Sequence, residues 1–191
     1  MESFSIDVFT KAAEGIIRSA PSETDALRRL KPLMEKLVTT PDSVPKEAFA
    51  SRKDRFANNL LYRPADRIFS VMAGNWSPGQ TTPIHDHLTW AGVCAGEERE
   101  SIYRRTDDGS NPKRARLALV GERINKKSHV TLLGRTGIHR IDNVSIAPSL
   151  SIHMYGLDMG TAERHSYDPM TGEIGKFVSG YCNVLRDEES E

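Results

Sequence analysis

From about Leu60 onward, short extended runs separated by turns limit the folds that this chain can adopt. Eight runs of strand character are predicted: Arg67–Trp76, Thr89–Ala95, Glu100–Arg105, Arg114–Val120, His129–Leu133, Ile138–Asn143, Leu150–Gly156 and Lys176–Leu185. Many short strands at close spacing, with no helical pattern between them, favour a sandwich or a small barrel over a parallel α/β sheet. We therefore predict a mainly β fold.

The N-terminal region, residues 1–58, is predicted to be helical. Apolar residues between Phe4 and Ile17 recur at the spacing of one helix face, and Ser22 with Asp25 is a plausible N-cap for a second helix. Pro32 should kink or split that second helix, because it has no N–H to donate. We expect the helices to cover one face of a sheet, so that residues 1–191 form a single domain. Residues 186–191 are mostly acidic and are expected to be a frayed tail.

The overall composition narrows the function classes. The 26 basic and 26 acidic residues cancel, so nothing in the charge favours nucleic acid or an anionic membrane surface as a partner. The two cysteines form no Cys-x-x-Cys pair, which suits a reducing compartment better than a disulfide framework. No segment has the length needed to span a bilayer, and charged residues interrupt the N-terminal region where a signal peptide needs an apolar run. A cytoplasmic protein is expected.

The stretch GQTTPIHDHLTWAGVCAG, residues 79–96, contains a His-x-His pair. Alternate residues of a strand point the same way, so His85 and His87 share a face while Asp86 points to the other. Two imidazoles side by side supply two thirds of a facial metal site. His139, in the run GIHRIDN, is a candidate third ligand. Such a pair alone is also compatible with solvated or hydrogen-bonded histidines on a strand edge.

The run SLSIHMYG alternates cleanly between apolar and polar residues. Ser151, His153 and Tyr155 share one face of the strand, and the residues between them are apolar. This pattern suits a barrel strand whose polar face lines a reactive cavity, and it equally suits an amphipathic strand whose polar face meets water. In a cavity, the three groups could exchange protons through hydrogen bonds beside a substrate. No nucleophile elbow surrounds Ser151, which disfavours a serine hydrolase.

Together, the motifs PIHDH, GIHRIDN and SIHMY resemble, in order and spacing, the thiol dioxygenases of the cupin superfamily, cysteine dioxygenase and its bacterial relatives. The resemblance covers about Phe56 to Gly172. It implies a cupin double-stranded β-helix, a small barrel of two antiparallel sheets, with N-terminal α-helices. It also implies mononuclear non-haem iron(II), Fe(II), as the cofactor. By position, the resemblance gives the ligands as His85, His87 and His139, and the hydrogen-bonding triad as Ser151, His153 and Tyr155.

Two departures from the family pattern concern the metal site and its neighbourhood. An ordinary cupin has a glutamate ligand shortly after the second histidine, and here Ala91 and Gly92 occupy that region, as expected for the three-histidine subset. In the mammalian enzymes a cysteine at the position of Gly92 crosslinks to the tyrosine that matches Tyr155. Glycine cannot do this and Cys94 is displaced by two positions, so we expect no crosslink.

A third departure concerns the substrate. The arginine that holds the cysteine carboxylate in the mammalian enzymes matches Asn58 here. Arg164, nine residues after Tyr155, instead matches the arginine of 3-mercaptopropionate dioxygenases. The resemblance therefore implies Arg164 as the substrate-binding cation, with Asn58 at the second position, and a thiol that carries a carboxylate without a firm requirement for an amino group.

The function predicted from these residues is oxidation of a small mercapto-carboxylate, 3-mercaptopropionate or cysteine, with O2 to the sulfinic acid. Three neutral imidazoles leave iron(II) its full positive charge, so an anionic thiolate is a favoured incoming ligand. The alternative is a cupin whose three histidines hold zinc or nickel for hydrolysis, isomerisation or sensing. The predicted partners are the thiol and O2, with no nucleic acid and no membrane, and the chain is expected to be a monomer or a homodimer.

Overall fold

The computed structural model describes residues 4–40, 42–95, 97–126 and 128–183. Two helices come first, α1 (Ile6–Ser19) and α2 (Glu23–Thr39), followed by the short 3-10 helix η1 (Lys46–Phe49). The strands are β1 (Ala57–Tyr62), β2 (Ser70–Trp76), β3 (Ile84–Asp86), β4 (Ala91–Ala95), β5 (Arg99–Arg105), β6 (Leu117–Ile124), β7 (His129–Leu133), β8 (Ile138–Asp142), β9 (Ser149–Tyr155), β10 (Arg164–Tyr167) and β11 (Ile174–Phe177). The predicted mainly β fold with N-terminal helices is confirmed.

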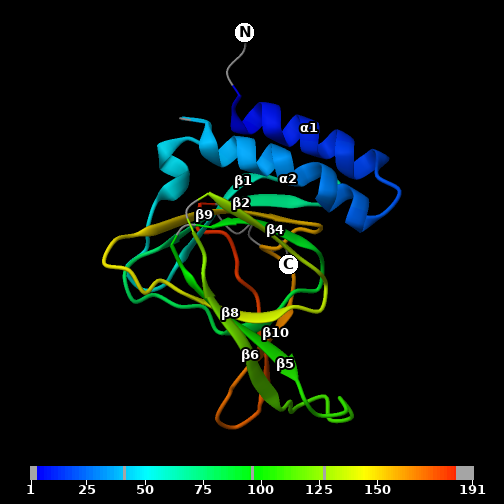
Figure 1. The fold of residues 1–191 in the computed structure, drawn as a ribbon, viewed down its shortest axis with the longest axis vertical. Helices are drawn as coiled ribbons and strands as arrows, with labels where there is room; N and C mark the ends of the chain where they lie inside the picture. The colour runs from blue at the N-terminus through cyan, green and yellow to red at the C-terminus, as the bar shows by residue number, and fades with distance from the viewer. Residues whose placement is uncertain (1–3, 41, 96, 127, 184–191) are drawn as a thin grey trace, which may run out of the picture.

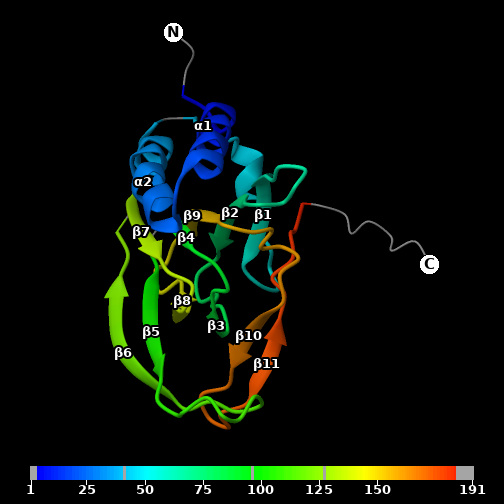
Figure 2. The same cartoon turned by 90° about the vertical axis from the view of Figure 1, so that its right-hand side faces the viewer.

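The strands form two antiparallel sheets. The first, which we call sheet A, has the order β1-β2-β9-β4-β7, and the second, sheet B, has the order β11-β10-β3-β8-β5-β6. Figures 1 and 2 show α1 and α2 lying across the outer side of sheet A, with sheet B on the side away from the helices. The inner faces of the two sheets therefore enclose the interior in which the candidate site lies.

Both helices begin at a serine that caps them. The hydroxyl oxygen of Ser5 accepts from Val8 N, and that of Ser22 accepts from Asp25 N, as predicted for the second helix. Of the two outcomes expected at Pro32, a kink or a split, the split does not occur, because α2 runs unbroken through it. Buried residues on both sides of Pro32 pack in the core between the helices and sheet A, and this packing offsets the hydrogen bond that proline cannot make.

The alternation of β9 divides the interior into an apolar and a polar layer. Ile152 and Met154 pack with Met34 and Val71 in the core under the helices. The intervening residues of β9 face the opposite way, toward sheet B, and they are buried although they are polar. Sheet A thus presents an apolar face to the helices and a polar face to the cavity.

The predicted strand positions agree with most of the observed ones, with three differences. The strand expected over Lys176–Leu185 is wrong: β11 ends at Phe177, and Gly180 adopts a positive φ of 67° that breaks an extended run. The strand expected at Arg114–Val120 is shifted toward the C-terminus, to β6. Strands β1 and β10 were not predicted. In the case of β10, the strand has only four residues and no apolar alternation. Residues 186–191, the expected tail, lie outside the described part.

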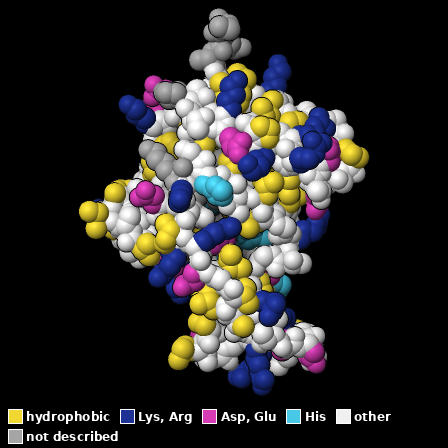
Figure 3. Space-filling view, viewed as in Figure 1, with side chains coloured by type: hydrophobic (Ala, Val, Ile, Leu, Met, Phe, Trp, Pro, Cys, Tyr) yellow, Lys and Arg dark blue, Asp and Glu magenta, His cyan; other side chains and the backbone are white. Residues whose placement is uncertain are grey.

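Two further features concern the distribution of charge on the surface and the length and composition of the helices. Figure 3 shows basic and acidic side chains interspersed over the face that it displays. Among the described residues, neither helix combines the length and the apolar composition required to cross a bilayer.

Candidate metal centre

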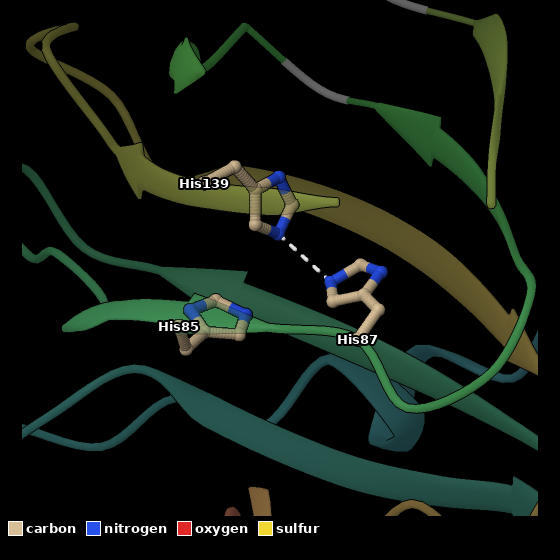
Figure 4. Close-up of side chains that lie close together, drawn as sticks. All are labelled: His85, His87 and His139. Carbon is tan, nitrogen blue, oxygen red and sulfur yellow. Dashed lines mark hydrogen bonds between the residues drawn. The ribbon is translucent and has the colours of Figure 1, made fainter. Parts of the chain in front are cut away.

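Three histidine side chains converge between the strands of sheet B. His85 on β3 lies directly opposite His139 on β8 in the antiparallel register, and His87 follows two residues after His85. Figure 4 shows the three rings turned toward a common point. One nitrogen of each ring lies within 4.8 Å of the others, and His87 Nε2 is 2.9 Å from His139 Nε2. All three side chains are buried. The structure thus brings together the three predicted ligands.

Hydrogen bonds on the far side of two rings fix their orientation. His85 Nδ1 lies 2.9 Å from the carbonyl oxygen of Pro83, which can only accept, so Nδ1 donates and Nε2 keeps its lone pair. His139 Nδ1 lies 2.8 Å from Glu100 Oε1 in the same way. A carboxylate behind a histidine is a common support of metal ligands, because it fixes the ring and raises the basicity of the other nitrogen.

Glu100, which sequence reasoning missed, is itself held by Arg123 at 2.6 Å. Burial favours the neutral acid, but hydrogen bonds and charge from His139 and Arg123 outweigh it and lower the pKa of Glu100 to about 2. Glu100 is therefore a carboxylate at neutral pH and can accept from His139.

The donor set fits a divalent metal ion. Burial, and then the nearby His139 and Arg164, hold the pKa values of His85 and His87 well below the ordinary value, so both rings are neutral. His87 Nε2 is hydrogen-bonded to His139 Nε2 at 2.9 Å, and a cation bound between the rings would take the place of the shared hydrogen. Three protein ligands of this kind leave coordination positions open.

The polar face of β9 forms the predicted row of hydrogen bonds beside these histidines. Ser151 Oγ is 3.1 Å from His153 Nε2, and His153 Nδ1 is 3.1 Å from the hydroxyl of Tyr155. The ring centroids of His87 and Tyr155 lie 5.8 Å apart, which brings Tyr155 next to the metal centre. Burial lowers the pKa of His153 to about 3 and raises the pKa of Tyr155. Both groups are therefore neutral at pH 7.

Arg164 lies on β10 with its side chain turned into the same interior. Its relative exposure is 3%, and burial lowers the pKa of its guanidinium. The guanidinium carbon lies 4.7 Å above the ring of Phe177, whose centroid is 5.6 Å from that of His85. Its Nε has no hydrogen-bond partner, and no carboxylate in the described part of the chain forms an ion pair with it. A buried cation with an unsatisfied Nε beside the three histidines is a ready binding site for an anion, although Asp86 lies near enough to raise the pKa of the guanidinium through its charge.

Asn58 lies on β1 opposite Gly74 and is buried, and within the described ranges its side chain makes no recorded hydrogen bond. Phe56, two residues earlier, stacks on Trp76 with centroids 5.6 Å apart, and Trp76 lies 5.5 Å from the ring of His153. These aromatic side chains form an apolar wall next to the row of β9. The predicted roles of Asn58 and Arg164 in substrate binding stay predictions.

Comparison with known proteins gives a family match over residues 35–168, more than half of the chain, described as cysteine dioxygenase type I. The chain belongs to the cysteine dioxygenase type I family. The match includes all three histidines and the β9 row, and the fold is the cupin fold, as the motifs predicted.

Solved structures with a similar fold are distant in sequence. A protein of Thermus thermophilus is 16% identical with a TM-score of 0.43, covering 59% of this chain and 92% of its own. A Klebsiella pneumoniae protein with a double-stranded β-helix domain is 11% identical with a TM-score of 0.42, covering 68% of this chain and 90% of its own. An oxalate oxidase in complex with glycolate is 20% identical with a TM-score of 0.41, over 56% of this chain and 54% of its own. We draw no functional conclusion from these three.

In this member of the cysteine dioxygenase family, the strand register places Ala91 opposite Tyr155 and Gly92 opposite Met154. A Cβ placed on Gly92 would lie 2.5 Å from Met34 Sδ in α2, so position 92 faces the helices. A side chain at position 92 would therefore point toward α2 and away from Tyr155 in this chain. The side chain of Cys94 lies outside the described part.

Proposed function

We propose that this protein is a non-haem iron(II) thiol dioxygenase that oxidises a small mercapto-carboxylate, 3-mercaptopropionate or cysteine, to its sulfinic acid. The observation that carries the proposal is the buried guanidinium of Arg164, whose Nε has no hydrogen-bond partner, beside three converging imidazoles. The three-histidine centre has no carboxylate ligand and lies next to a fixed cation. Such a site suits a substrate that carries two anionic groups, a thiolate and a carboxylate.

The three histidines would hold the metal through their inward nitrogens. Bound iron(II) would supply coordination positions for the thiolate and for dioxygen, together with the electrons that activate dioxygen. His139 would be the most rigidly held ligand because Glu100 fixes its ring. Holding both reactants in one buried cavity removes most of the entropic cost of bringing them together.

Arg164 would bind and orient the carboxylate end of the substrate. A guanidinium offers two parallel N–H donors to a carboxylate, and Phe177 fixes its plane from one side. Because the charge of Arg164 is buried, the interaction is little screened by water. This role requires a carboxylate on the substrate but no amino group.

The β9 row would control protons at the substrate end of the cavity. Tyr155 is the member of the row next to His87, and its neutral hydroxyl can donate to or accept from a group bound there. His153 and Ser151 connect that hydroxyl to the interior behind it.

Oxygen uptake with a panel of thiols tests the proposal. We expect iron-loaded protein to consume O2 with 3-mercaptopropionate, cysteine and mercaptosuccinate. Replacing Arg164 by Met removes the charge but keeps much of the volume. Loss of a charge-assisted bond of about 1.5–3 kcal/mol should raise the apparent KM for these thiols roughly tenfold to a hundredfold.

The controls isolate the carboxylate. Cysteamine lacks that group, so any activity on it should be the same in the Arg164→Met variant and the wild type. Arg104→Met, which removes an exposed arginine of β5, should leave every KM unchanged. An equal loss for cysteamine and the mercapto-carboxylates, or no loss for either, would show that Arg164 does not bind the carboxylate.

A further inference from the structure

Behind the β9 row lies a buried carboxylate, Glu98, that no motif of the sequence indicated. Glu98 directly precedes β5 and has a relative exposure of 1%. Its Oε1 lies 2.7 Å from Ser149 Oγ and 3.0 Å from Ser151 Oγ. The backbone carbonyl of Glu98 accepts from Asn125 N at 2.8 Å, which fixes the segment in place. The row therefore has four members, with Glu98 at the end away from the metal centre.

Donor and acceptor chemistry gives the row one direction. Glu98 Oε1 is the acceptor in both contacts, so both serine hydroxyls donate to it. Ser151 has a single hydrogen, and once it is donated to Glu98 the oxygen can only accept from His153 Nε2–H. A neutral imidazole protonated on Nε2 has a bare Nδ1, which then accepts from the hydroxyl of Tyr155.

We infer that Glu98 is a positioning residue that holds His153 in the Nε2–H form and turns the Tyr155 hydrogen toward His153. The lone pairs of the Tyr155 oxygen then face the three-histidine centre. This inference rests on the proposed function for its kinetic consequence, although the protonated nitrogen of His153 is a property of the protein alone. Glu98 touches neither substrate nor metal and acts through Ser151 and His153.

Without the carboxylate, the direction of the row is no longer fixed. Ser151 can then donate to His153 Nε2 instead of accepting from it. His153 would carry its hydrogen on Nδ1, and the Tyr155 hydroxyl would turn its hydrogen toward the metal centre. The row would change its proton arrangement without losing any of its three original members.

The decisive experiment combines nitrogen NMR of the histidine rings with steady-state kinetics. Spectra of 15N-labelled protein, prepared with and without the diamagnetic ion Zn2+, report which ring nitrogen of His153 carries hydrogen. A His153→Gln spectrum assigns the signals. We expect Nε2–H in the wild type. In Glu98→Met, which keeps the side-chain length without an acceptor oxygen, we expect a substantial Nδ1–H population.

Kinetically, Glu98→Met should lower kcat about tenfold to a hundredfold through misorientation of Tyr155, with iron content and KM within about twofold of wild type. Ser149→Ala removes the other hydroxyl on the same carboxylate oxygen but leaves the row intact, and should retain both the Nε2–H form and the wild-type kcat.

Two results would overturn the inference. The first is an Nδ1–H form of His153 in the wild type, which needs no variant and so stands even if Glu98→Met does not fold. The second is an unchanged Nε2–H form in folded Glu98→Met. If the wild type consumes no O2 with any thiol, the proposed function fails, while the NMR result still decides the role of Glu98.

Discussion

At the scale of single residues, we expect Glu100 to determine how firmly the three histidines hold a metal ion. Its Oε1 accepts from His139 Nδ1, and Arg123 holds its other oxygen. Glu100→Gln keeps the shape but weakens the acceptor, so we expect metal affinity to fall about 10–100-fold. Calorimetric titration with Zn2+ and iron content after dialysis measure this. Glu122→Gln, at an exposed glutamate of β6, is the matched control, and equal affinities in both variants would contradict the supporting role of Glu100.

Tyr155 is the residue at which proton control and metal binding can be separated. Tyr155→Phe removes the hydroxyl bonded to His153 and leaves the three histidines untouched. We expect kcat to fall about a hundredfold, the lower end of the range for positioned acid–base groups, while iron content stays at the wild-type level. Parallel measurement of bound iron and O2 uptake checks this. If iron and activity fall together, the tyrosine has a structural role.

At the scale of elements, the contact between β4 and α2 depends on the absence of a side chain at Gly92. An added Cβ would approach Met34 Sδ to 2.5 Å, closer than van der Waals contact allows. Gly92→Ala should therefore lower the free energy of unfolding by about 1–3 kcal/mol, measured by urea denaturation. Gly121→Ala in β6, where a Cβ meets nothing within 4 Å, should cause no loss. Equal stability of the two variants would show that α2 shifts freely to make room.

Local patterns in the sequence found the residues whose partners lie within one strand, and the family resemblance added His139 and Arg164. Neither indicated Glu98 or Glu100, whose partners come from far along the chain. The period of two along β9 was enough to place Ser151, His153 and Tyr155 on one face. Glu98 and Glu100 bond to Ser151 and His139, which are 53 and 39 residues away, so their roles depend on how β5 pairs with β8 and packs over β9. The pairing of β5 with β8 cannot be predicted from the residues near Glu98 and Glu100 alone.

For the helices and short strands, too, local features could be predicted from the sequence and features that depend on distant contacts could not. The serine cap of α2 is a local signal and was predicted correctly, whereas the continuity of α2 through Pro32 depends on packing against sheet A. Strand β10 owes its existence to pairing with β3 and β11, because its four residues carry no alternation of their own. Its tertiary position, and with it the burial of Arg164, could not be read from the sequence.

At the scale of the whole molecule, the buried neutral His153 links stability to pH. The unfolded chain takes up a proton at this residue below its ordinary pKa of 6.5, whereas the folded protein does so only near its pKa of about 3. The free energy of unfolding therefore falls as pH falls through this window, by up to about 1.4 kcal/mol per pH unit for one such group.

Urea denaturation of the metal-free protein between about pH 6.5 and 5, the upper part of that window, measures this contribution. His153→Gln should reduce the slope of stability against pH relative to wild type, and replacement of the exposed His129 by Gln should leave the slope unchanged. Identical slopes for wild type and His153→Gln would mean that His153 is not held neutral in the folded state.

We propose that the three-histidine centre, loaded with iron(II), adds both atoms of dioxygen to the sulfur of a mercapto-carboxylate. Mass spectrometry of the product formed from 3-mercaptopropionate under 18O2 tests it most directly. We expect a sulfinic acid that carries two heavy oxygen atoms, formed with consumption of one O2 per thiol and absent in the His139→Ala variant. A product with one or no heavy oxygen, or turnover of substrate by the zinc-loaded protein without O2 uptake, would contradict it.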